Sequence, residues 1–367
     1  MIKSYQYLIN KENYVLKRAL IALSGGVDSS ACAYLMKNSG YDCIGVTMKL
    51  HSAKDSLNEG CISNHDIEDA RRVCQTLGID YSVVDFSGDF ENFVIKNFIE
   101  AYENGATPNP CIECNYHLKF DKLFKHAEAI GCDYIVTGHY ARIEFDEKYG
   151  RMVLKKGLDE SKDQSYVLYR LSSKQIEKTI FPLGAFSKAE AREIAERAGL
   201  DVSTKRDSQD ICFIPDGDYA KFIEGYTKKR YPCGNFVTLD GRILGQHKGI
   251  IRYTIGQGKG LGLALPHRMY VCAKRIDTNE VVIGENEDLF SNELWAQNVI
   301  LSAIDKINSP IRVQAKVRYN QKAQNATASM ENGLLHIYFD EPQRAICKGQ
   351  SVVIYDGDVV LGGGTIL

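Results

Sequence analysis

Short apolar runs alternate with longer amphipathic segments through the first half of the chain. Runs of roughly four to eight apolar residues are typical of buried parallel strands, and apolar positions three and four apart are typical of helices. The predicted strands are 19–23, 43–48, 81–85 and 134–137, and the predicted helices are 29–38, 66–77, 89–102 and 117–130. This alternation predicts a parallel sheet covered by helices on both faces, with ligands bound at the carboxyl ends of its strands.

The pattern changes at about Pro215, where helical periodicity becomes scarce and short alternating strands with glycines take over. Asp240-Gly241 and Asp356-Gly357 lie between apolar runs, which is a signal for hairpins. Several short strands are predicted between 295 and 367, among them 311–317, 334–339 and 351–355, and together they suggest a small β-barrel. We therefore expect an α/β domain over 1–214, a small central β-rich domain over 215–290 and a C-terminal β-barrel over 291–367.

Composition narrows the class of protein. The chain has 367 residues, of which 44% are hydrophobic and 25% charged, and this balance is ordinary for a globular protein. A net charge of −2 argues neither for nor against a nucleic-acid partner, because a basic face can lie within a neutral total. No apolar run approaches the roughly 18 residues of a membrane span, and no basic-then-apolar leader begins the chain, so we expect a cytoplasmic protein.

Residues 22–30 read Ala-Leu-Ser-Gly-Gly-Val-Asp-Ser-Ser and connect a predicted strand to a predicted helix. Small residues at such a turn expose backbone N–H groups beside the positive end of the helix, which suits an anion. The segment lacks both the Gly-Lys-Ser/Thr of a P-loop and the G-x-G-x-x-G of a dinucleotide fold. A plain glycine turn is the competing interpretation, but Asp28 and three serines in register favour binding. The segment resembles the SGGxDS loop of the ATP pyrophosphatases, which bind the pyrophosphate of ATP and transfer AMP to an oxygen.

The eleven cysteines are an odd number in a chain with no export signal, which predicts reduced thiols rather than a disulfide framework. Cys111 and Cys114 form a C-x-x-C directly before a predicted helix, whose N-terminus favours thiolates. Cys212 lies in a polar segment that we expect to be mobile. The spacing alone does not choose between redox, zinc and iron–sulfur sites, although no second pair completes a zinc site. We expect core roles for Cys32, Cys43, Cys74, Cys132 and Cys272, and structural roles for Cys61, Cys233 and Cys347.

These motifs together resemble the tRNA-specific 2-thiouridylase (MnmA) family, within the ATP pyrophosphatase (PP-loop) superfamily, over nearly the whole chain. The nucleotide loop alone indicates only the superfamily. The combination of Cys212-Phe213-Ile214 with the Gly-Gln-x-Lys-Gly-Leu-Gly stretch at 256–262 is specific for the family. The segments that carry the resemblance are 24–30, 108–110, 114–115, 137–142, 162–166, 207–214, 247–249, 253–257 and 259–262.

The resemblance implies a PP-loop (adenine nucleotide hydrolase-like) catalytic domain and a tRNA-binding C-terminal barrel. The implied enzyme replaces the 2-oxygen of the wobble uridine with sulfur. It adenylates that oxygen with ATP, and sulfur carried as a cysteine persulfide then displaces AMP. The implied cofactors are ATP and Mg²⁺. The implied partners are the tRNAs for Lys, Glu and Gln and an upstream sulfur-donor protein, and the enzyme is expected to be a monomer.

Family roles carry over by position. Cys114 matches the nucleophile and Cys212 the persulfide carrier, so reduction of the persulfide would leave a Cys114–Cys212 disulfide. The predicted ATP contacts are Ala22, Leu23, Ser24, Gly25, Gly26, Val27, Asp28, Ser29, Met48 and Gly138. The positions matching the loop against the target base are Asn109, Pro110 and Cys111. The predicted tRNA contacts are His139, Lys162, Asp163, Gln164, Arg318, Tyr319 and Gln350.

The expected chemistry is coherent on its own terms. A urea-like carbonyl oxygen is a poor leaving group, whereas the phosphate oxygen of an adenylate leaves readily, so activation by ATP must precede attack. Mg²⁺ would neutralise the charge that develops on the pyrophosphate. Sulfur is a good nucleophile at neutral pH only as an anion, so cysteines with a lowered pKa suit the second half-reaction.

One position departs from the family pattern. Cys111 stands where well-known members carry aspartate, so an acid–base role cannot be assumed for it. With Cys114 and Cys212 it offers three thiols, and three thiolates on a four-iron cluster would leave one iron to hold sulfide. The expectation is a persulfide relay, and an iron–sulfur cluster as sulfide carrier competes with it. The residues also leave open a small-molecule adenylating ligase and an RNA-binding protein built on an inactive nucleotide fold.

Isolated charged residues are usually only solvated, whereas clustered basic residues indicate a surface that binds phosphates. We therefore expect a basic face that binds RNA. The residues expected to supply part of it are Lys155, Lys156, Lys162, Arg206, Lys228, Lys229, Arg230, Lys248 and Arg252.

Overall fold

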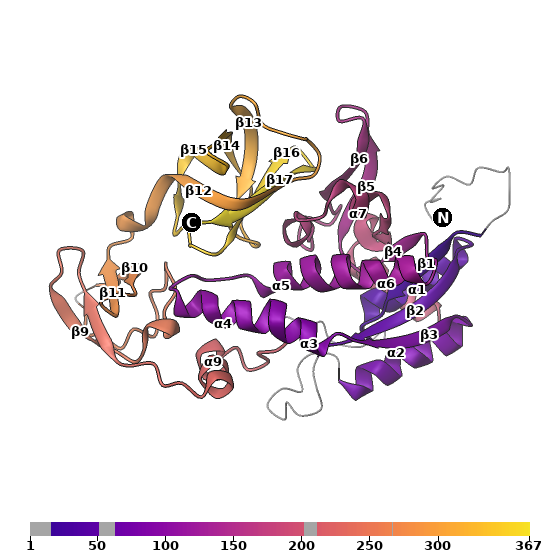
Figure 1. Cartoon of the computed structure of the whole chain (residues 1–367), viewed down its shortest axis with the longest axis horizontal. Helices are drawn as coiled ribbons and strands as arrows, with labels where there is room; N and C mark the ends of the chain where they lie inside the picture. The colour runs from indigo at the N-terminus through magenta and orange to yellow at the C-terminus, as the bar shows by residue number, and fades with distance from the viewer. Residues whose placement is uncertain (1–15, 51–62, 202–210, 266) are drawn as a thin grey trace. The chain divides into compact units, whose positions relative to one another are not determined.

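The computed structural model describes residues 16–50, 63–201, 211–265 and 267–367 (Figure 1). The chain forms two compact units. The first, here the sheet unit, comprises Met1–Phe90, Tyr116–Ser165 and Ser173–Gln209. The second, the barrel unit, comprises Glu91–Asn115, Tyr166–Ser172 and Asp210–Leu367. The segment that carries Cys111 and Cys114 thus folds with the C-terminal half of the chain.

The sheet unit is built on five parallel strands in the order β3-β2-β1-β4-β7. β1 is central and its residues Ala19, Leu20 and Ile21 are fully buried, as expected of a strand covered on both faces. The four predicted strands are all present, and the two-residue β7 was not predicted. Their bounds are β1 Arg18–Ala22, β2 Asp42–Lys49, β3 Asp80–Asp85, β4 Tyr134–Val136 and β7 Thr179–Ile180.

Helices α1 Val27–Asn38, α2 Asn64–Leu77 and α8 Lys188–Arg197 belong to this unit. The core joins α1, β1 and α8 through small side chains such as Ala31, Ala33 and Ala191, which let the helix backbones approach closely. α2 begins with a capping box, in which Ser63 and Asp66 each bond the backbone N–H of the other. It ends at Gly78 in the left-handed conformation.

Two long helical runs differ from their predicted bounds. The first consists of α3 Ser87–Phe90, a π-helical stretch Glu91–Ile95 and α4 Lys96–Glu103. The second consists of α5 Pro110–Glu113, a π-helical stretch Cys114–Lys122 and α6 Leu123–Ala129. The expectation that this helix starts near His117 was wrong. It starts at Pro110 because the Asn109 side chain caps it and proline is favoured at the first helical position. Cys111 and Cys114 therefore lie on the helix and not before it.

A hairpin in the first half of the chain was also missed. β5 Ala141–Asp146 pairs antiparallel with β6 Arg151–Lys156 across a turn that ends at Gly150, whose φ is +64°. The alternation of Ala141, Ile143 and Phe145 with charged residues is the signal for this strand. The remaining short elements of the sheet unit are α7 Ser173–Glu177 and the 3₁₀ turn Pro182–Ala185.

The central part of the barrel unit is a four-stranded sheet in the order β10-β11-β8-β9. Its strands are β8 Gly234–Val237, β9 Ile243–His247, β10 Tyr270–Arg275 and β11 Glu280–Gly284, preceded by helix α9 Tyr219–Thr227. The predicted hairpin at Asp240-Gly241 is confirmed, since it joins β8 to β9.

The C-terminal strands close into a barrel, as predicted. They follow the order β12-β15-β14-β13-β16-β17, and β12 also pairs with β17. The hairpin at Asp356-Gly357 joins β16 to β17. The strands are β12 Phe290–Leu301, β13 Ile311–Lys316, β14 Gln324–Glu331, β15 Leu334–Arg344, β16 Ser351–Asp356 and β17 Val359–Ile366. Within the described residues no helix is long and apolar enough to cross a bilayer.

Segment 166–172 is part of the same unit and packs on the barrel. Tyr166 is fully buried and donates its hydroxyl to the Ser351 carbonyl at 2.8 Å. Tyr169 lies beside Gly363 of β17, where an added Cβ would come within 2.9 Å of the tyrosine ring and 2.3 Å of the Val352 carbonyl oxygen. Only glycine fits this position.

We predict that Gly363→Ala lowers the free energy of unfolding by about 1–3 kcal/mol, because strand or ring must shift to accept the methyl group. Denaturant unfolding measures the change. Gly225→Ala is the matched control, since Gly225 lies in helix α9 with open space around its missing Cβ. The control should be neutral or stabilising by about 0.5–1 kcal/mol. Equal stability of Gly363→Ala and the wild type would contradict the close approach.

Candidate active site

The Ser-Gly-Gly loop links β1 to α1 in the sheet unit. Gly25 has a φ of +69°, and a Cβ there would lie 2.4 Å from the Asp66 carbonyl oxygen. Ser29 and Ser30 both donate their hydroxyls to the Gly26 carbonyl, at 3.1 and 2.8 Å. The Ser24 N–H donates to the Ser29 hydroxyl at 3.2 Å. No side chain caps α1 at Gly26, so the amides of its first turn are suited to bind an anionic ligand.

Asp28 is held by a cation within this loop region. Both of its carboxylate oxygens accept from the Lys188 ammonium, at 2.8 and 2.7 Å. The Tyr140 hydroxyl also donates to Asp28, at 2.7 Å. The pair is largely shielded, with side-chain exposures of 15% for Lys188 and 32% for Asp28. The carboxylate charge next to the uncapped helix end is therefore neutralised within the protein.

Lys188 was missed in the sequence. It is the first residue of α8, which begins with a capping box formed by Ser187 and Glu190. The Ser187-x-x-Glu190 spacing was a readable signal for that helix start. The sequence alone does not indicate that Lys188 binds Asp28, because the two residues are 160 positions apart and only the fold brings them together.

Other predicted ATP contacts lie close to the loop. A Cβ on Gly138 would lie 3.1 Å from the backbone carbon of Asp28 and from the Ser29 nitrogen, so the two segments meet backbone to backbone. Met48 is buried at the carboxyl end of β2. Its neighbour Thr47 donates to the Leu23 carbonyl at 2.9 Å. The structure thus brings the sequence-predicted residues of the loop, β2 and Gly138 together.

Of the residues predicted to meet tRNA in the sheet unit, His139 and Asp163 are buried, and Lys162 and Gln164 are half-buried. His139 lies with its Nδ1 2.6 Å from the Thr137 hydroxyl, and burial together with the Lys119 charge lowers the pKa of His139 well below its usual value. Gln164 exchanges hydrogen bonds with the Tyr140 backbone. Asp163 accepts from the Gly157 and Ser165 backbone N–H groups and from the Ser165 hydroxyl. Asp163 therefore holds a turn, and tRNA contact for these residues stays a prediction.

The two cysteines of the C-x-x-C differ in exposure. Cys111 is exposed and Cys114 is half-buried, and both are thiols. Asn109 accepts from the Cys111 N–H at 3.1 Å, which fixes the first turn of the helix. Glu113, between them, accepts from Arg170 at 2.7 Å. Asn115 donates to the Val167 carbonyl at 3.0 Å. The helix start that carries the thiols is thereby fastened to segment 166–172.

Cys212 is half-buried and disulfide-bonded. Since Cys114 is a thiol, the structure does not contain the Cys114–Cys212 disulfide expected as a product of the relay. A sulfur in a disulfide cannot ligate iron as a thiolate. In the part of the chain that the structure describes, no three Cys, His, Asp or Glu side chains gather to hold a metal. The residues as arranged do not fit an iron–sulfur cluster.

Mg²⁺ in nucleotide sites is held by phosphate oxygens and one or two carboxylates. Asp28 is the carboxylate of the loop, and Lys188 occupies both of its oxygens. We therefore assign no Mg²⁺ ligand in this arrangement.

The core roles expected of several other cysteines agree with their burial. Cys32, Cys43, Cys74 and Cys132 are buried and Cys272 is half-buried. Burial raises the pKa of Cys43 to about 11 and that of Cys74 to about 12, so these thiols are poor nucleophiles. Cys347 is also buried, whereas Cys233 is exposed. Cys61 lies outside the described residues.

The predicted tRNA contacts of the barrel unit already have partners in the protein. Arg318 donates to the Ala345 carbonyl and, at 3.7 Å, to the Cys347 sulfur. The ring centroids of Tyr319 and Tyr166 lie 6.2 Å apart in an edge-to-face arrangement. Gln350 donates its amide N–H to the Thr107 carbonyl at 2.7 Å.

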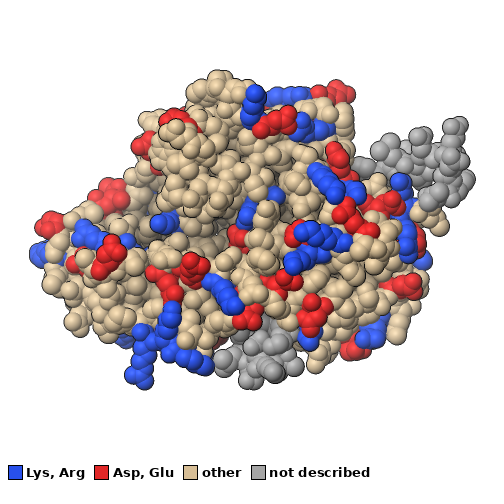
Figure 2. Space-filling model, viewed as in Figure 1, with Lys and Arg blue, Asp and Glu red and all other residues tan. Residues whose placement is uncertain are grey.

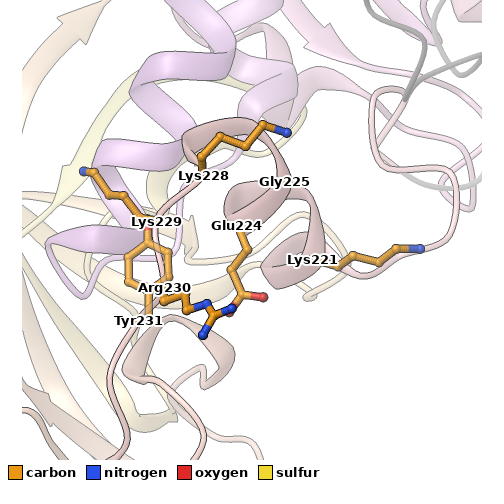
Figure 3. Close-up of a pocket in the computed structure, with 7 residues that line it drawn as sticks. All are labelled: Lys221, Glu224, Gly225, Lys228, Lys229, Arg230 and Tyr231. Carbon is orange, nitrogen blue, oxygen red and sulfur yellow. The ribbon is translucent and has the colours of Figure 1, made fainter.

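Charges of both signs are interspersed on the face shown in Figure 2, as the net charge of −2 suggests. An open cavity of about 630 Å³ nevertheless gathers basic side chains on α9 and the residues after it. Figure 3 shows the side chains of the three lysines extending away from one another. The lining residues are Lys221, Glu224, Gly225, Lys228, Lys229, Arg230 and Tyr231.

Several residues of the expected basic face are paired. Lys229 binds Glu103 at 2.8 Å and Arg252 binds Glu224 at 2.7 Å. Lys155, in β6, binds Asp146 at 2.9 Å. Within the described residues no ion pair involves Lys228 or Arg230, so the cavity keeps net positive charge. Arg206 lies outside the described residues.

Family models match three successive parts of the chain. They are described as a tRNA methyl transferase HUP domain over residues 17–216, a tRNA methyl transferase PRC-barrel domain over 220–285 and an aminomethyltransferase β-barrel domain over 291–366. The tRNA-specific 2-thiouridylase MnmA of Clostridioides difficile is 51% identical over 96% of this chain and 99% of its own. The chain belongs to the MnmA family.

Two more relatives support this family assignment. The MnmA of Clostridium acetobutylicum is 50% identical over 95% of this chain and 99% of its own. The MnmA of Clostridium perfringens is 48% identical over 95% of this chain and 98% of its own. Among solved structures, a 4-thiouridine synthetase–RNA complex with bound ATP covers 57% of this chain and 50% of that chain, with 19% identity and a TM-score of 0.35.

We predict that Lys188→Met weakens ATP binding by about tenfold or more, because it leaves the Asp28 carboxylate uncompensated beside the polyphosphate. Titration calorimetry measures the dissociation constant. If Lys188 acts through Asp28, the double variant Asp28→Asn with Lys188→Met recovers part of the loss. Arg197→Met, which removes an exposed cation from the same helix, serves as the control. Wild-type affinity in Lys188→Met would refute this role.

Proposed function

We propose that this protein replaces the 2-oxygen of the wobble uridine of tRNA with sulfur, by adenylation with ATP and transfer of sulfur from a cysteine. The proposal rests chiefly on the Ser-Gly-Gly loop, whose uncapped helix end is suited to hold a pyrophosphate. Membership of the MnmA family supports it, since relatives about half identical over nearly the whole chain are named tRNA-specific 2-thiouridylases.

Each of the two half-reactions has residues suited to it. In the first, the loop amides bind the polyphosphate while the uridine oxygen attacks the α-phosphorus and pyrophosphate leaves. In the second, a persulfide sulfur attacks the adenylated carbon and AMP leaves. We assign the persulfide to Cys212 and its reduction to Cys114, which ends the cycle with a disulfide between the two. Cys212 is disulfide-bonded in the structure, so a thiol reductant must free it before the donor protein loads it with sulfur.

The finer parts of the proposal concern partners. Substrates are the tRNAs for Lys, Glu and Gln, and a separate sulfur-donor protein loads Cys212 in the cytoplasm. The enzyme acts as a monomer. The basic cavity at α9 is suited to RNA phosphates, because Lys228 and Arg230 add positive charge without an acidic partner among the described residues.

The decisive experiment measures pyrophosphate release from ATP with and without tRNA, followed by sulfur analysis of the tRNA. We predict release that depends on tRNA. Cys114→Ser should keep this release and lower thiolation on the order of a hundredfold or more, because only the second half-reaction needs the thiol. Cys233→Ser, at an exposed cysteine outside the proposed sulfur relay, is the matched control. Pyrophosphate release that is the same with and without tRNA would indicate a small-molecule ligase. No pyrophosphate release at all would indicate a passive RNA binder.

Cys111 discriminates between the two sulfur carriers. If sulfur travels as a persulfide, Cys111→Ser should retain measurable thiolation, because serine can occupy the first turn of the helix without joining the relay. A cluster would lose one of three ligands, and both activity and visible iron absorbance would disappear. Anaerobic purification with iron and sulfide analysis, for the wild type and Cys111→Ser in parallel, gives the readout. Activity that requires iron would overturn the persulfide assignment.

A further inference from the structure

Thr107 lies between the end of α4 and the capping residue of α5, and both of its backbone polar groups bond to one turn of the barrel. Its N–H donates to the Lys348 carbonyl at 2.8 Å. Its carbonyl accepts from the Gln350 side-chain amide at 2.7 Å. A loop residue whose donor and acceptor are both satisfied by one turn is held in position and orientation.

Gly349, between these two partners, fits closely against the loop. Its φ is +86°, and an added Cβ would lie 2.8 Å from the Ala106 Cβ and 3.2 Å from the Thr107 nitrogen. The turn is itself fixed to the last strand, since Gly349 N–H donates to the Ile366 carbonyl at 2.9 Å and Ile366 N–H donates to the Gln350 carbonyl at 2.8 Å. A rigid part of the barrel therefore meets the loop.

The other end of the cysteine segment is tied to the same part of the barrel through one intermediate. Asn115 donates to the Val167 carbonyl at 3.0 Å. Tyr166, the residue before Val167, donates to the Ser351 carbonyl at 2.8 Å. The segment 107–115, which contains both thiols, is thus fastened at each end to barrel residues 348–351.

We propose that the barrel turn 348–351 positions the cysteine segment for sulfur transfer, and that Gln350 is a positioning residue for Cys114 that acts through Thr107. This inference rests on the proposed function. It assigns Gln350 a task within the protein in place of the tRNA contact expected from the sequence. Misplacement of a reacting group by about 1 Å can slow a reaction about a hundredfold, so the anchor matters although it touches no reacting atom.

The first test uses Gln350→Met, which keeps the size of the side chain and removes its donor. We expect tRNA affinity and tRNA-dependent pyrophosphate release within about twofold of the wild type. Single-turnover thiolation at saturating tRNA should fall about tenfold or more. Gln350→Lys, which restores a donor toward the Thr107 carbonyl, should recover part of the rate. Loss of tRNA affinity with normal thiolation at saturation would make Gln350 a tRNA contact and overturn the proposal.

The second test disturbs the same contact from the Gly349 side and does not depend on enzyme activity. Gly349→Ala should increase hydrogen–deuterium exchange of residues 107–115. Gly333→Ala is the matched control, because Gly333 has a φ of +80° in another barrel turn but open space around its missing Cβ. If both variants leave exchange in 107–115 unchanged, the anchor does not exist. If the wild type releases no pyrophosphate with tRNA, the proposed function fails while this exchange test still decides the anchor.

Discussion

The nucleotide loop depends on a backbone approach that leaves no room for a side chain. Gly25 lies so close to the Asp66 carbonyl that a Cβ would overlap it. Gly138 also lies close to Asp28 and Ser29, where a Cβ would come within 3.1 Å of their backbone atoms. Because these contacts join backbone to backbone, the capping box that fixes the start of α2 and the end of β4 together set where the loop amides lie. The anion site is therefore a property of the sheet and its connections.

The position of Asp28 at the start of α1 makes its negative charge important for ligand binding. A carboxylate in the first turn of a helix is favourable for the helix dipole, but it opposes a polyphosphate bound at the same place. Lys188 resolves the conflict by binding both oxygens of Asp28. The loop can then keep an acidic residue for its fold without presenting net negative charge to an anionic ligand.

The sequence predicted the parallel strands, the change of texture near Pro215 and the closed barrel, because each rests on local periodicity or turn chemistry. It predicted the strand, turn and helix around the Ser-Gly-Gly segment because that segment is contiguous. It placed the helix start near His117, whereas Asn109 and Pro110 form a capped start. The Lys188–Asp28 pair and the Gln350–Thr107 bond join residues 160 and 243 positions apart, and local patterns carry no information on such contacts.

The cysteine segment belongs to the barrel unit, which places the residues of the two proposed half-reactions in different units. Residues 91–115 and 166–172 fold with the barrel, while the nucleotide loop folds with the parallel sheet. The thiols and the loop amides are thus supported by different cores. In the proposed reaction, adenylation uses the loop amides and sulfur transfer uses the thiols. A helix start held by a barrel turn, and not by the nucleotide sheet, keeps these two requirements in separate parts of the fold.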